Sequence, residues 1–289
     1  MDPGSPLRSV RDDGAERDKA EKKATTATGS LTIVGLGPGT PEWITPAAQA
    51  ALDAASDLIG YGPYLDRVPE RSGRTKHASD NRVEVQRAAH ALKLAAEGRK
   101  VAVVSGGDPG VFAMAAAVFE ALEAGPAEWL VIPITVEPGI TAMLAAAARA
   151  GAPLGGDFCA LSLSDNLKPW EVVTARLTAA LAADFVICLY NPISKARPWQ
   201  LGAALDLAAE HRAAETPVLF ARAVGRPDEI LRVLTLAEAI ATAGTADMAT
   251  LVMIGASSTR LIAREGAAPY VYTPRSVTKS PCATSQGRT

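Results

Sequence analysis

Short apolar runs alternate with alanine-rich amphipathic stretches from residue 31 to about residue 268. Runs rich in β-branched residues predict strands, and apolar positions at helical spacing predict helices. Strands are predicted at 31–37, 131–136, 158–163, 184–190, 217–224, 230–236 and 248–255. A further strand is predicted in 100–110, where it runs directly into a loop. Helices are predicted at 45–57, 82–98, 111–123, 140–150, 169–182 and 198–210. Thr45 is the expected N-cap of its helix, with Pro46 at the first helical position. The alternation predicts an α/β protein.

Breaks in this pattern predict the domain organisation. A Gly/Pro-rich stretch at 151–157 separates two comparable α/β halves. The first thirty residues hold six acidic and six basic side chains with no apolar periodicity, and the C-terminal end is similarly polar. Such composition is typical of disordered segments. We therefore expect a disordered leader, an N-terminal domain, a C-terminal domain and a tail, at residues 1–30, 31–152, 153–268 and 269–289.

Composition and charge then exclude several classes of protein. The 289 residues include 29 Lys and Arg against 31 Asp and Glu, and 48% are hydrophobic. This composition excludes a fibre and a disulfide scaffold, and the near-neutral charge disfavours nucleic acid as a partner. The leader and tail carry 0 and +3, which leaves the folded region at -5. No apolar run reaches the length of a membrane span. Three widely spaced cysteines favour a reducing cytoplasm and no structural zinc.

A glycine-rich turn, Gly35 to Gly39, follows the first predicted strand. Strand ends of this kind bind ligands in open α/β sheets. The dinucleotide fingerprint fails here, because its third glycine would fall at Thr40 and Pro38 removes an amide. Asp57 also precedes the second strand, where a dinucleotide site would need an acidic residue at the strand's end. A nicotinamide-dependent dehydrogenase remains an alternative that these residues disfavour.

Three further strand ends carry candidate ligand-binding residues. They are Ser105 to Gly110, Glu137 to Ala142 and Leu189 to Pro192. Asp108 could accept hydrogen bonds from a ligand or simply cap the next helix. Thr141 could contact a ligand or only open its alanine-rich helix. Each motif alone is compatible with an ordinary loop.

The order and spacing of these motifs resemble the tetrapyrrole methylase family. The motifs that carry the resemblance are GLGPG (35–39), GGDPG (106–110), PGITA (138–142), SLSDNLKPWE (162–171) and YNP (190–192). Gly106 departs from the pattern, since serine is commoner there, and Ile193 stands where a basic residue is expected. The resemblance covers about residues 31–260.

The resemblance implies a two-domain fold, each domain a mixed sheet flanked by helices, with S-adenosyl-L-methionine in the interdomain cleft. It implies methylation of C17 of precorrin-3B with ring contraction to precorrin-4, in cobalamin biosynthesis, leaving S-adenosyl-L-homocysteine and using no metal. A cytoplasmic homodimer is the implied form. The alternatives are a cobalt-factor III substrate, as in the anaerobic pathway, and a non-catalytic tetrapyrrole-binding protein.

The resemblance and the local charge pattern also assign residues to roles. The expected cofactor residues are Pro38, Gly107, Asp108, Val111, Thr141, Ala142, Leu161, Tyr190, Asn191, Thr250 and Leu251. Asp80 and Asp165 are candidate acids or bases for the rearrangement, although each also fits an Asx-turn. The expected cations for substrate carboxylates are Arg74, Lys76, His77, Arg82, Lys168 and Arg197.

Overall fold

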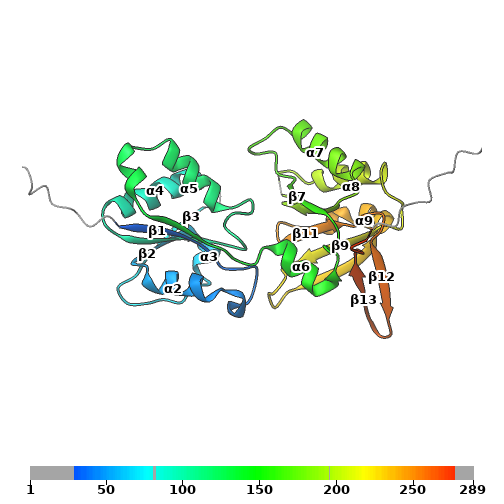
Figure 1. Cartoon of the computed structure of the whole chain (residues 1–289), viewed down its shortest axis with the longest axis horizontal. Coiled ribbons are helices and arrows are strands. Elements are labelled where there is room, and N and C mark those ends of the chain that lie inside the picture. Colours follow the sequence, from blue (N-terminus) through cyan, green and yellow to red (C-terminus); the bar gives the residue numbers. More distant parts are fainter. Residues whose placement is uncertain (1–28, 81–82, 195, 277–289) are drawn as a thin grey trace, which may run out of the picture.

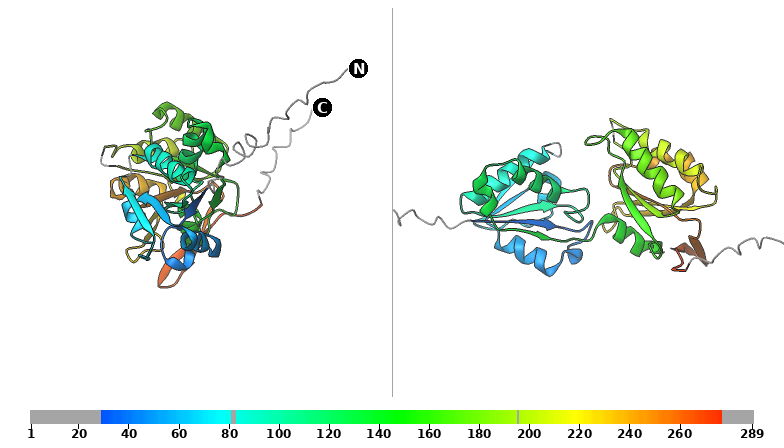
Figure 2. Two further views of the ribbon diagram at one scale, coloured as in Figure 1. Left: turned by 90° about the vertical axis from the view of Figure 1, so that its left-hand side faces the viewer. Right: turned by 45° about the horizontal axis from the view of Figure 1, so that its top comes forward.

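The computed structural model describes residues 29–80, 83–194 and 196–276 and folds them into two lobes that lie side by side (Figures 1 and 2). Most of the expected leader, part of the expected tail and Arg82 lie outside the described residues. Each lobe is built around a five-stranded sheet. No helix in the described ranges is long and apolar enough to cross a bilayer.

The first sheet is entirely parallel, in the order β3-β2-β4-β1-β5. Its strands are β1 (Ser30–Gly35), β2 (Asp57–Tyr61), β3 (Thr75–Ser79), β4 (Lys100–Ser105) and β5 (Ile134–Glu137). Its helices are α2 (Pro46–Ala54), α3 (Gly62–Leu65), α4 (Glu84–Ala96) and α5 (Met114–Glu123), with short turns η1 (Pro41–Trp43) and η2 (Ala127–Val131). Two separate apolar clusters line its faces, one with α4 and α5 and one with α2 and α3. Cover on both faces explains why β1 and β4 are almost uninterrupted apolar runs.

The second sheet is mixed, in the order β10-β9-β11-β8-β7. Its strands are β7 (Phe158–Ser162), β8 (Val186–Tyr190), β9 (Pro217–Arg222), β10 (Ile230–Thr235) and β11 (Thr250–Ile254). One face is covered by α7 (Trp170–Ala182), α8 (Gln200–Ala209), α9 (Leu236–Ala241) and η3 (Ala243–Thr245), and the other by α6 (Ala142–Ala150). A third sheet joins β6 (Gly151–Ala152) to the hairpin of β12 (Arg260–Arg264) and β13 (Ala267–Tyr272).

The structure confirms the two-domain α/β architecture and corrects three details of it. Only the second sheet is mixed. Helix α6, assigned to the first half, packs its alanines on β8, β9 and β11 of the second sheet. The chain therefore passes from the first lobe to the second before Ala142, not at the Gly/Pro-rich break. Strand β13 runs to Tyr272 within the expected tail, and its Val271 is fully buried.

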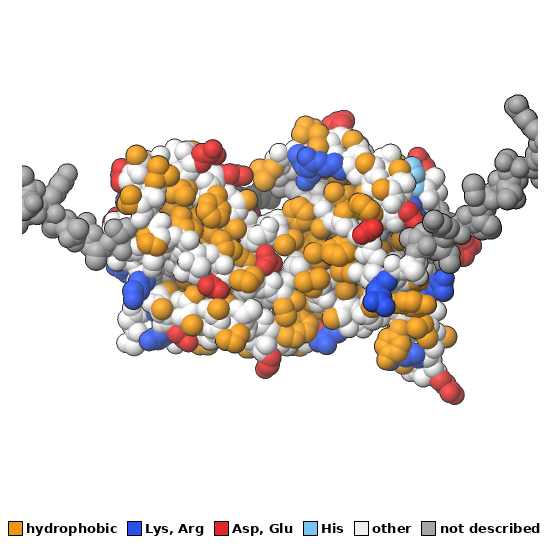
Figure 3. All heavy atoms as spheres, viewed as in Figure 1, with side chains coloured by type: hydrophobic (Ala, Val, Ile, Leu, Met, Phe, Trp, Pro, Cys, Tyr) orange, Lys and Arg blue, Asp and Glu red, His pale blue; other side chains and the backbone are white. Residues whose placement is uncertain are grey.

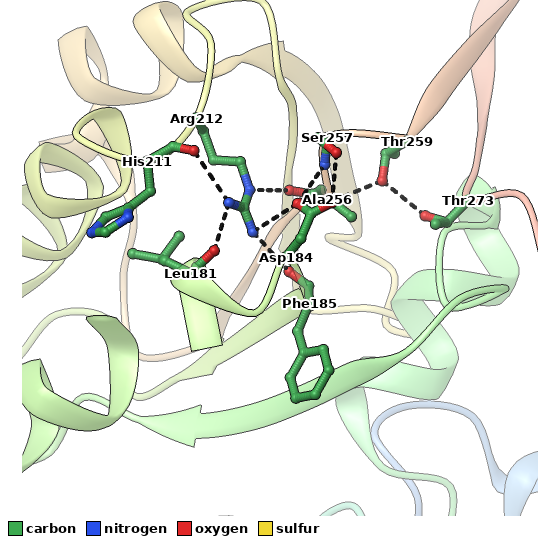
Figure 4. Close-up of polar contacts among 10 residues, drawn as sticks. Leu181, Asp184, Phe185, His211, Arg212, Ala256, Ser257, Thr259 and Thr273 are labelled. Carbon is green, nitrogen blue, oxygen red and sulfur yellow. Dashed lines mark hydrogen bonds and ion pairs between the residues drawn. The ribbon is translucent and has the colours of Figure 1, made fainter. Parts of the chain in front are cut away.

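A buried arginine fastens the end of the second sheet that lies away from the first lobe (Figure 4). The Arg212 side chain is only 4% exposed and lies 3.2 Å from the Asp184 carboxylate. It also donates hydrogen bonds to the carbonyl oxygens of Leu181, at 2.8 Å, and Gly255, at 3.4 Å. Asp184 in turn accepts from the backbone N–H of Ser257. The network is structural, because it joins the start of β8 to the end of β11.

Candidate functional site

Where the lobes touch, the edge of the first sheet at which its strands end meets the edge of the second sheet at which β7, β8 and β9 end. Gly39, after β1, packs so closely on Gly225, after β9, that a Cβ on Gly39 would lie 2.2 Å from the Gly225 backbone. Arg226 donates from Nε to the carbonyl oxygen of Pro38 at 3.2 Å. Ligands of open α/β sheets bind at this end of the strands. The junction is therefore the candidate site.

Three glycine loops converge on the first-lobe side of the junction. The backbones of Gly37 and Gly107 exchange two hydrogen bonds of 3.1 Å. A Cβ on Gly35 would lie 2.7 Å from the Gly139 nitrogen, and a Cβ on Gly139 would lie 2.3 Å from the Gly107 oxygen. Gly107 itself has a left-handed φ of +67°, and a Cβ added to it would lie 3.9 Å from the Ile140 carbonyl oxygen and from the Thr141 Cα. A backbone cradle of this kind lets a ligand approach without meeting a side chain.

Asp108 ties two of these loops together. Its Oδ1 accepts from the Gly110 N–H at 2.8 Å and its Oδ2 accepts from the Gly139 N–H at 3.0 Å. Helix α5 begins later, at Met114, with Ala113 as its N-cap and no side-chain cap. The helix-cap interpretation of Asp108 is therefore wrong. The carboxylate sets the distance between the loops that follow β4 and β5.

Arg67 forms hydrogen bonds with the glycine-rich turn. The sequence did not predict this role. Its guanidinium donates to the carbonyl oxygens of Leu36, Gly37 and Gly39 at 2.9 to 3.0 Å. Burial lowers the pKa of this guanidinium, and the charge of nearby Arg226 lowers it further. A lone arginine 28 to 31 residues from its partners carries no local sequence signal.

The second lobe contributes Tyr190 and Asn191 at the end of β8. The Tyr190 hydroxyl accepts from the Met143 N–H at 3.1 Å and shares a 2.5 Å hydrogen bond with the Thr141 hydroxyl. Burial is the main cause that raises the pKa of this phenol, so its hydroxyl stays protonated. Asn191 donates from its amide to the Ser162 hydroxyl at 2.9 Å. These predicted cofactor residues lie together at the junction.

The remaining predicted cofactor residues are less directly placed. Thr250 starts β11 at the junction edge, but its hydroxyl donates to Asp247 at 2.8 Å. Leu251 is buried in the core beneath α6. Leu161 packs against the core under α7, while Val111 and Ala142 are half-buried beside the glycine loops. Thr250 and Leu251 can therefore offer only backbone atoms to a ligand.

The two candidate carboxylates both follow strands that end at the junction edge. Asp80 comes directly after β3, and its carbonyl oxygen accepts from Arg87 at 2.6 Å. Asp165, after β7, is paired with Arg197. Burial raises the pKa of Asp165, but the hydrogen bond from Arg197 outweighs this and brings the pKa below its ordinary value. Asp165 is therefore a poor base, and Arg197 is already partnered.

Lys168 lies in the same loop as Asp165. Its ammonium donates to the carbonyl oxygen of Ser164 at 3.2 Å. Burial lowers its pKa, and the charge of Arg176 lowers it further. It lies in the loop that follows the carboxyl end of β7.

The predicted cations Arg74, Lys76 and His77 lie before β3 or within it. Arg74 donates to the carbonyl oxygen of Leu52, and Lys76 donates to that of Val68 and pairs with Glu70. His77 points to Asp57, at 2.9 Å. Strands of the first sheet run parallel, so Arg74 and Lys76 lie at its amino-terminal edge, away from the glycine loops. Of this group only Arg82 would follow β3, and it lies outside the described residues.

Comparisons with known proteins identify the family of this chain. The family described as tetrapyrrole (corrin/porphyrin) methylases matches residues 30–240. A Sinorhizobium protein named precorrin-3B C(17)-methyltransferase is 58% identical over 86% of this chain and 97% of its own length. A Salmonella typhimurium protein named "Probable cobalt-factor III C(17)-methyltransferase" is 39% identical over 79% of this chain and 93% of its own.

Two solved structures extend the comparison. The crystal structure of the methyltransferase CobJ has a TM-score of 0.80 and 53% identity, over 85% of this chain and all of that one. The uroporphyrin-III C-methyltransferase of Thermus thermophilus, solved with S-adenosyl homocysteine, has a TM-score of 0.57 at 22% identity, over 78% of this chain and 92% of that one, and shows a shared fold. By sequence and by fold, this chain belongs to the tetrapyrrole (corrin/porphyrin) methylases.

Proposed function

We propose that this protein methylates C17 of precorrin-3B, with S-adenosyl-L-methionine as methyl donor, and contracts the macrocycle to give precorrin-4. The observation that carries the proposal is the 58% identity to a precorrin-3B C(17)-methyltransferase over nearly the whole of that protein. The relative named for cobalt-factor III is more distant, at 39%. The metal-free substrate is therefore favoured over the cobalt-bearing one.

The junction fits the methyl donor. The glycine cradle offers close backbone approach, and Thr141 lies beside Gly107. Thr141 and Tyr190 supply hydroxyls, and the amide of Asn191 is oriented by Ser162. The proposed cofactor residues remain Pro38, Gly107, Asp108, Val111, Thr141, Ala142, Leu161, Tyr190, Asn191, Thr250 and Leu251. Of these, Thr250 and Leu251 would contact the cofactor through their backbone.

The reaction requires the protein mainly to align the methyl donor with the nucleophilic carbon of the substrate. The sulfonium of S-adenosyl-L-methionine supplies an already activated methyl group, and an enamine-like carbon of a precorrin is nucleophilic by itself. Orientation of two reactants can contribute roughly 7–11 kcal/mol of barrier reduction. Arg67 and Asp108 hold the loops that provide this alignment. For the rearrangement we propose Asp80 as the acid or base in preference to Asp165, because the lowered pKa of Asp165 makes it a weak base and leaves it without a proton to donate.

Incubation with precorrin-3B and S-adenosyl-L-methionine tests the proposal directly. We expect a methylated, ring-contracted product identified by mass spectrometry, and no comparable turnover of cobalt-factor III under the same conditions. Preferred turnover of cobalt-factor III would establish the alternative substrate. Calorimetry adds a binding readout: S-adenosyl-L-homocysteine should bind and NAD should not. Absence of any homocysteine-nucleoside binding would refute the assignment, and binding without turnover would indicate a non-catalytic protein.

We also propose that the protein acts as a homodimer in the cytoplasm. The β12–β13 hairpin, which projects from the second lobe (Figures 1 and 3), exposes Leu261, Ile262 and Tyr270. Apolar side chains gathered on a projecting arm are typical of a surface that another chain covers. Light scattering should give twice the mass of one chain, and a monomer mass at micromolar concentration would contradict the dimer.

A further inference from the structure

An exposed aromatic ring, that of Phe112, follows the glycine loop at 106–110. Phe112 is 51% exposed and has a left-handed φ of +52°. Bulky side chains rarely adopt this backbone conformation because their Cβ meets the neighbouring carbonyl oxygen. Residues held in such conformations persist only when their surroundings determine them, and they gather at ligand sites.

The same backbone feature recurs around the junction. In the described part of the chain, four residues other than glycine have positive φ, and three of them follow strands that end at this edge. Phe112 follows β4, Asn191 follows β8 and Ala223 follows β9. The fourth, Asp184, belongs to the structural network around Arg212. Backbone strain is thus concentrated where the lobes meet.

A partner in the other lobe fixes the position of the Phe112 ring. Its centroid lies 5.2 Å from that of Tyr190, with the planes tilted by 59°. The Tyr190 hydroxyl is itself held by Thr141 and the Met143 N–H. One side of the Phe112 ring therefore rests on an anchored phenol, while the rest of the ring is open to solvent.

The chemistry of the exposed part of this ring indicates what lies against it. The ring has no heteroatom, so it cannot form hydrogen bonds with the carboxylate, the ammonium group or the ribose hydroxyls of the methyl donor, which the polar groups at Thr141 and Asn191 suit better. A flat conjugated macrocycle matches an apolar aromatic surface. We propose that Phe112 is a substrate-binding residue, and that the tetrapyrrole macrocycle lies against the exposed part of its ring. This inference rests on the proposed function.

The test separates substrate binding from cofactor binding. With saturating S-adenosyl-L-methionine, Phe112→Ala should raise the KM for precorrin-3B about tenfold, the size of effect expected for one aromatic contact. The Kd for S-adenosyl-L-homocysteine should stay within about twofold of wild type. Phe112→Tyr, which keeps the ring, should restore the KM. Phe119→Ala removes a ring that is 47% exposed on α5 and is the matched control, expected to behave as wild type.

A second variant guards against a folding defect. Phe112→Gly removes the same ring and relieves the left-handed backbone, so it should show the same rise in KM with a Tm no lower than that of Phe112→Ala. An unchanged KM in both variants would overturn the proposal. A weakened Kd for S-adenosyl-L-homocysteine would also overturn it, by placing the ring against the cofactor. Failure of the wild-type protein itself to bind the homocysteine nucleoside or to turn over precorrin-3B would instead refute the proposed function.

Discussion

Arg67 is the side chain on which the shape of the glycine-rich turn depends. Its guanidinium donates hydrogen bonds to three carbonyl oxygens, those of Leu36, Gly37 and Gly39. Arg67→Ala should lower the free energy of unfolding by about 3 kcal/mol, because buried carbonyls lose charged donors. Arg67→Lys should recover only part of this loss, since one ammonium cannot reproduce the planar fork. Urea unfolding measures both.

The control for Arg67 is Arg176→Ala, on an exposed position of α7. We expect that variant to stay within about 0.5 kcal/mol of wild type. If Arg67→Ala were equally neutral, the turn would owe its shape to its own glycines alone.

The ring of Tyr64 explains why residue 106 is a glycine, where serine is commoner in the family pattern. A Cβ there would lie 2.7 Å from two ring atoms of Tyr64, whose ring also meets Tyr61 edge to face. Gly106→Ala should push the Tyr64 ring aside and cost about 1 kcal/mol of lost aromatic contact. The same substitution in a Tyr64→Ala background should cost almost nothing, so a double-mutant cycle should show coupling of that size. An additive cycle would mean that Tyr64 does not require the glycine.

At the scale of elements, the edge strand β3 is fixed by a buried carboxylate on its neighbour β2. Asp57 is 1% exposed and accepts from Arg99 at 2.7 and 2.8 Å, and its Oδ1 lies 2.9 Å from His77 Nε2. Burial alone would raise the pKa of Asp57, but the hydrogen bonds from Arg99, His77 and Ser56 bring it below its ordinary value of 3.8. The carboxylate therefore contributes stability above pH 3.8 and loses it as the pH falls through the lowered pKa.

Asp57→Asn should accordingly destabilise the protein by about 2 kcal/mol at pH 7, since Arg99 and His77 lose the charged acceptor of their hydrogen bonds. The difference from wild type should be constant above about pH 5 and shrink below pH 3.8. Urea unfolding at several pH values measures it. Asp206→Asn, on an exposed position of α8, is the matched control. A gap that is unchanged at pH 3 would show that the carboxylate's charge is not what stabilises β3.

The sequence predicted the elements whose apolar pattern is strong, and it failed where the pattern is weak. The buried strands β1, β4, β8 and β11 are continuous apolar runs, and Thr45 caps α2 as expected. Strand β3 has no fully buried residue, because it is an edge strand. The β12–β13 hairpin buries only Val271, so nothing in its local pattern distinguishes it from a tail.

At the scale of the whole molecule, the candidate site depends on contacts between residues far apart in the chain. Glycine and proline mark the loops, so the sequence placed Pro38, Gly107, Asp108, Tyr190 and Asn191 correctly at strand ends. Sequence distance does not show which end of a parallel strand a charge occupies, so the position of Arg74 and Lys76 at the amino-terminal edge of the first sheet could not be predicted. Arg67 and Phe112 were missed because burial and backbone strain are properties of the folded chain.

Because Gly39 packs closely on Gly225, a single added methyl group at Gly39 would change the distance between the two lobes. A Cβ on Gly39 would come within 2.2 to 2.4 Å of three Gly225 backbone atoms, and backbone cannot move aside as a side chain can. Gly39→Ala should therefore separate the lobes slightly while leaving each sheet intact. Misplacement of about 1 Å can cost as much as about 100-fold in rate. We expect at least a tenfold weaker Kd for S-adenosyl-L-homocysteine by calorimetry, with unchanged far-ultraviolet circular dichroism.

Gly202→Ala provides the control for this experiment, because nothing lies within 4 Å of the added Cβ in helix α8. Replacing a helical glycine by alanine should raise the free energy of unfolding by about 1 kcal/mol and leave the ligand affinity unchanged. If Gly39→Ala also retained wild-type affinity, the ligand could not bridge the two lobes at this junction. A loss of affinity in Gly39→Ala alone would mean that the cofactor binds only when the two sheet edges at the junction are held in contact.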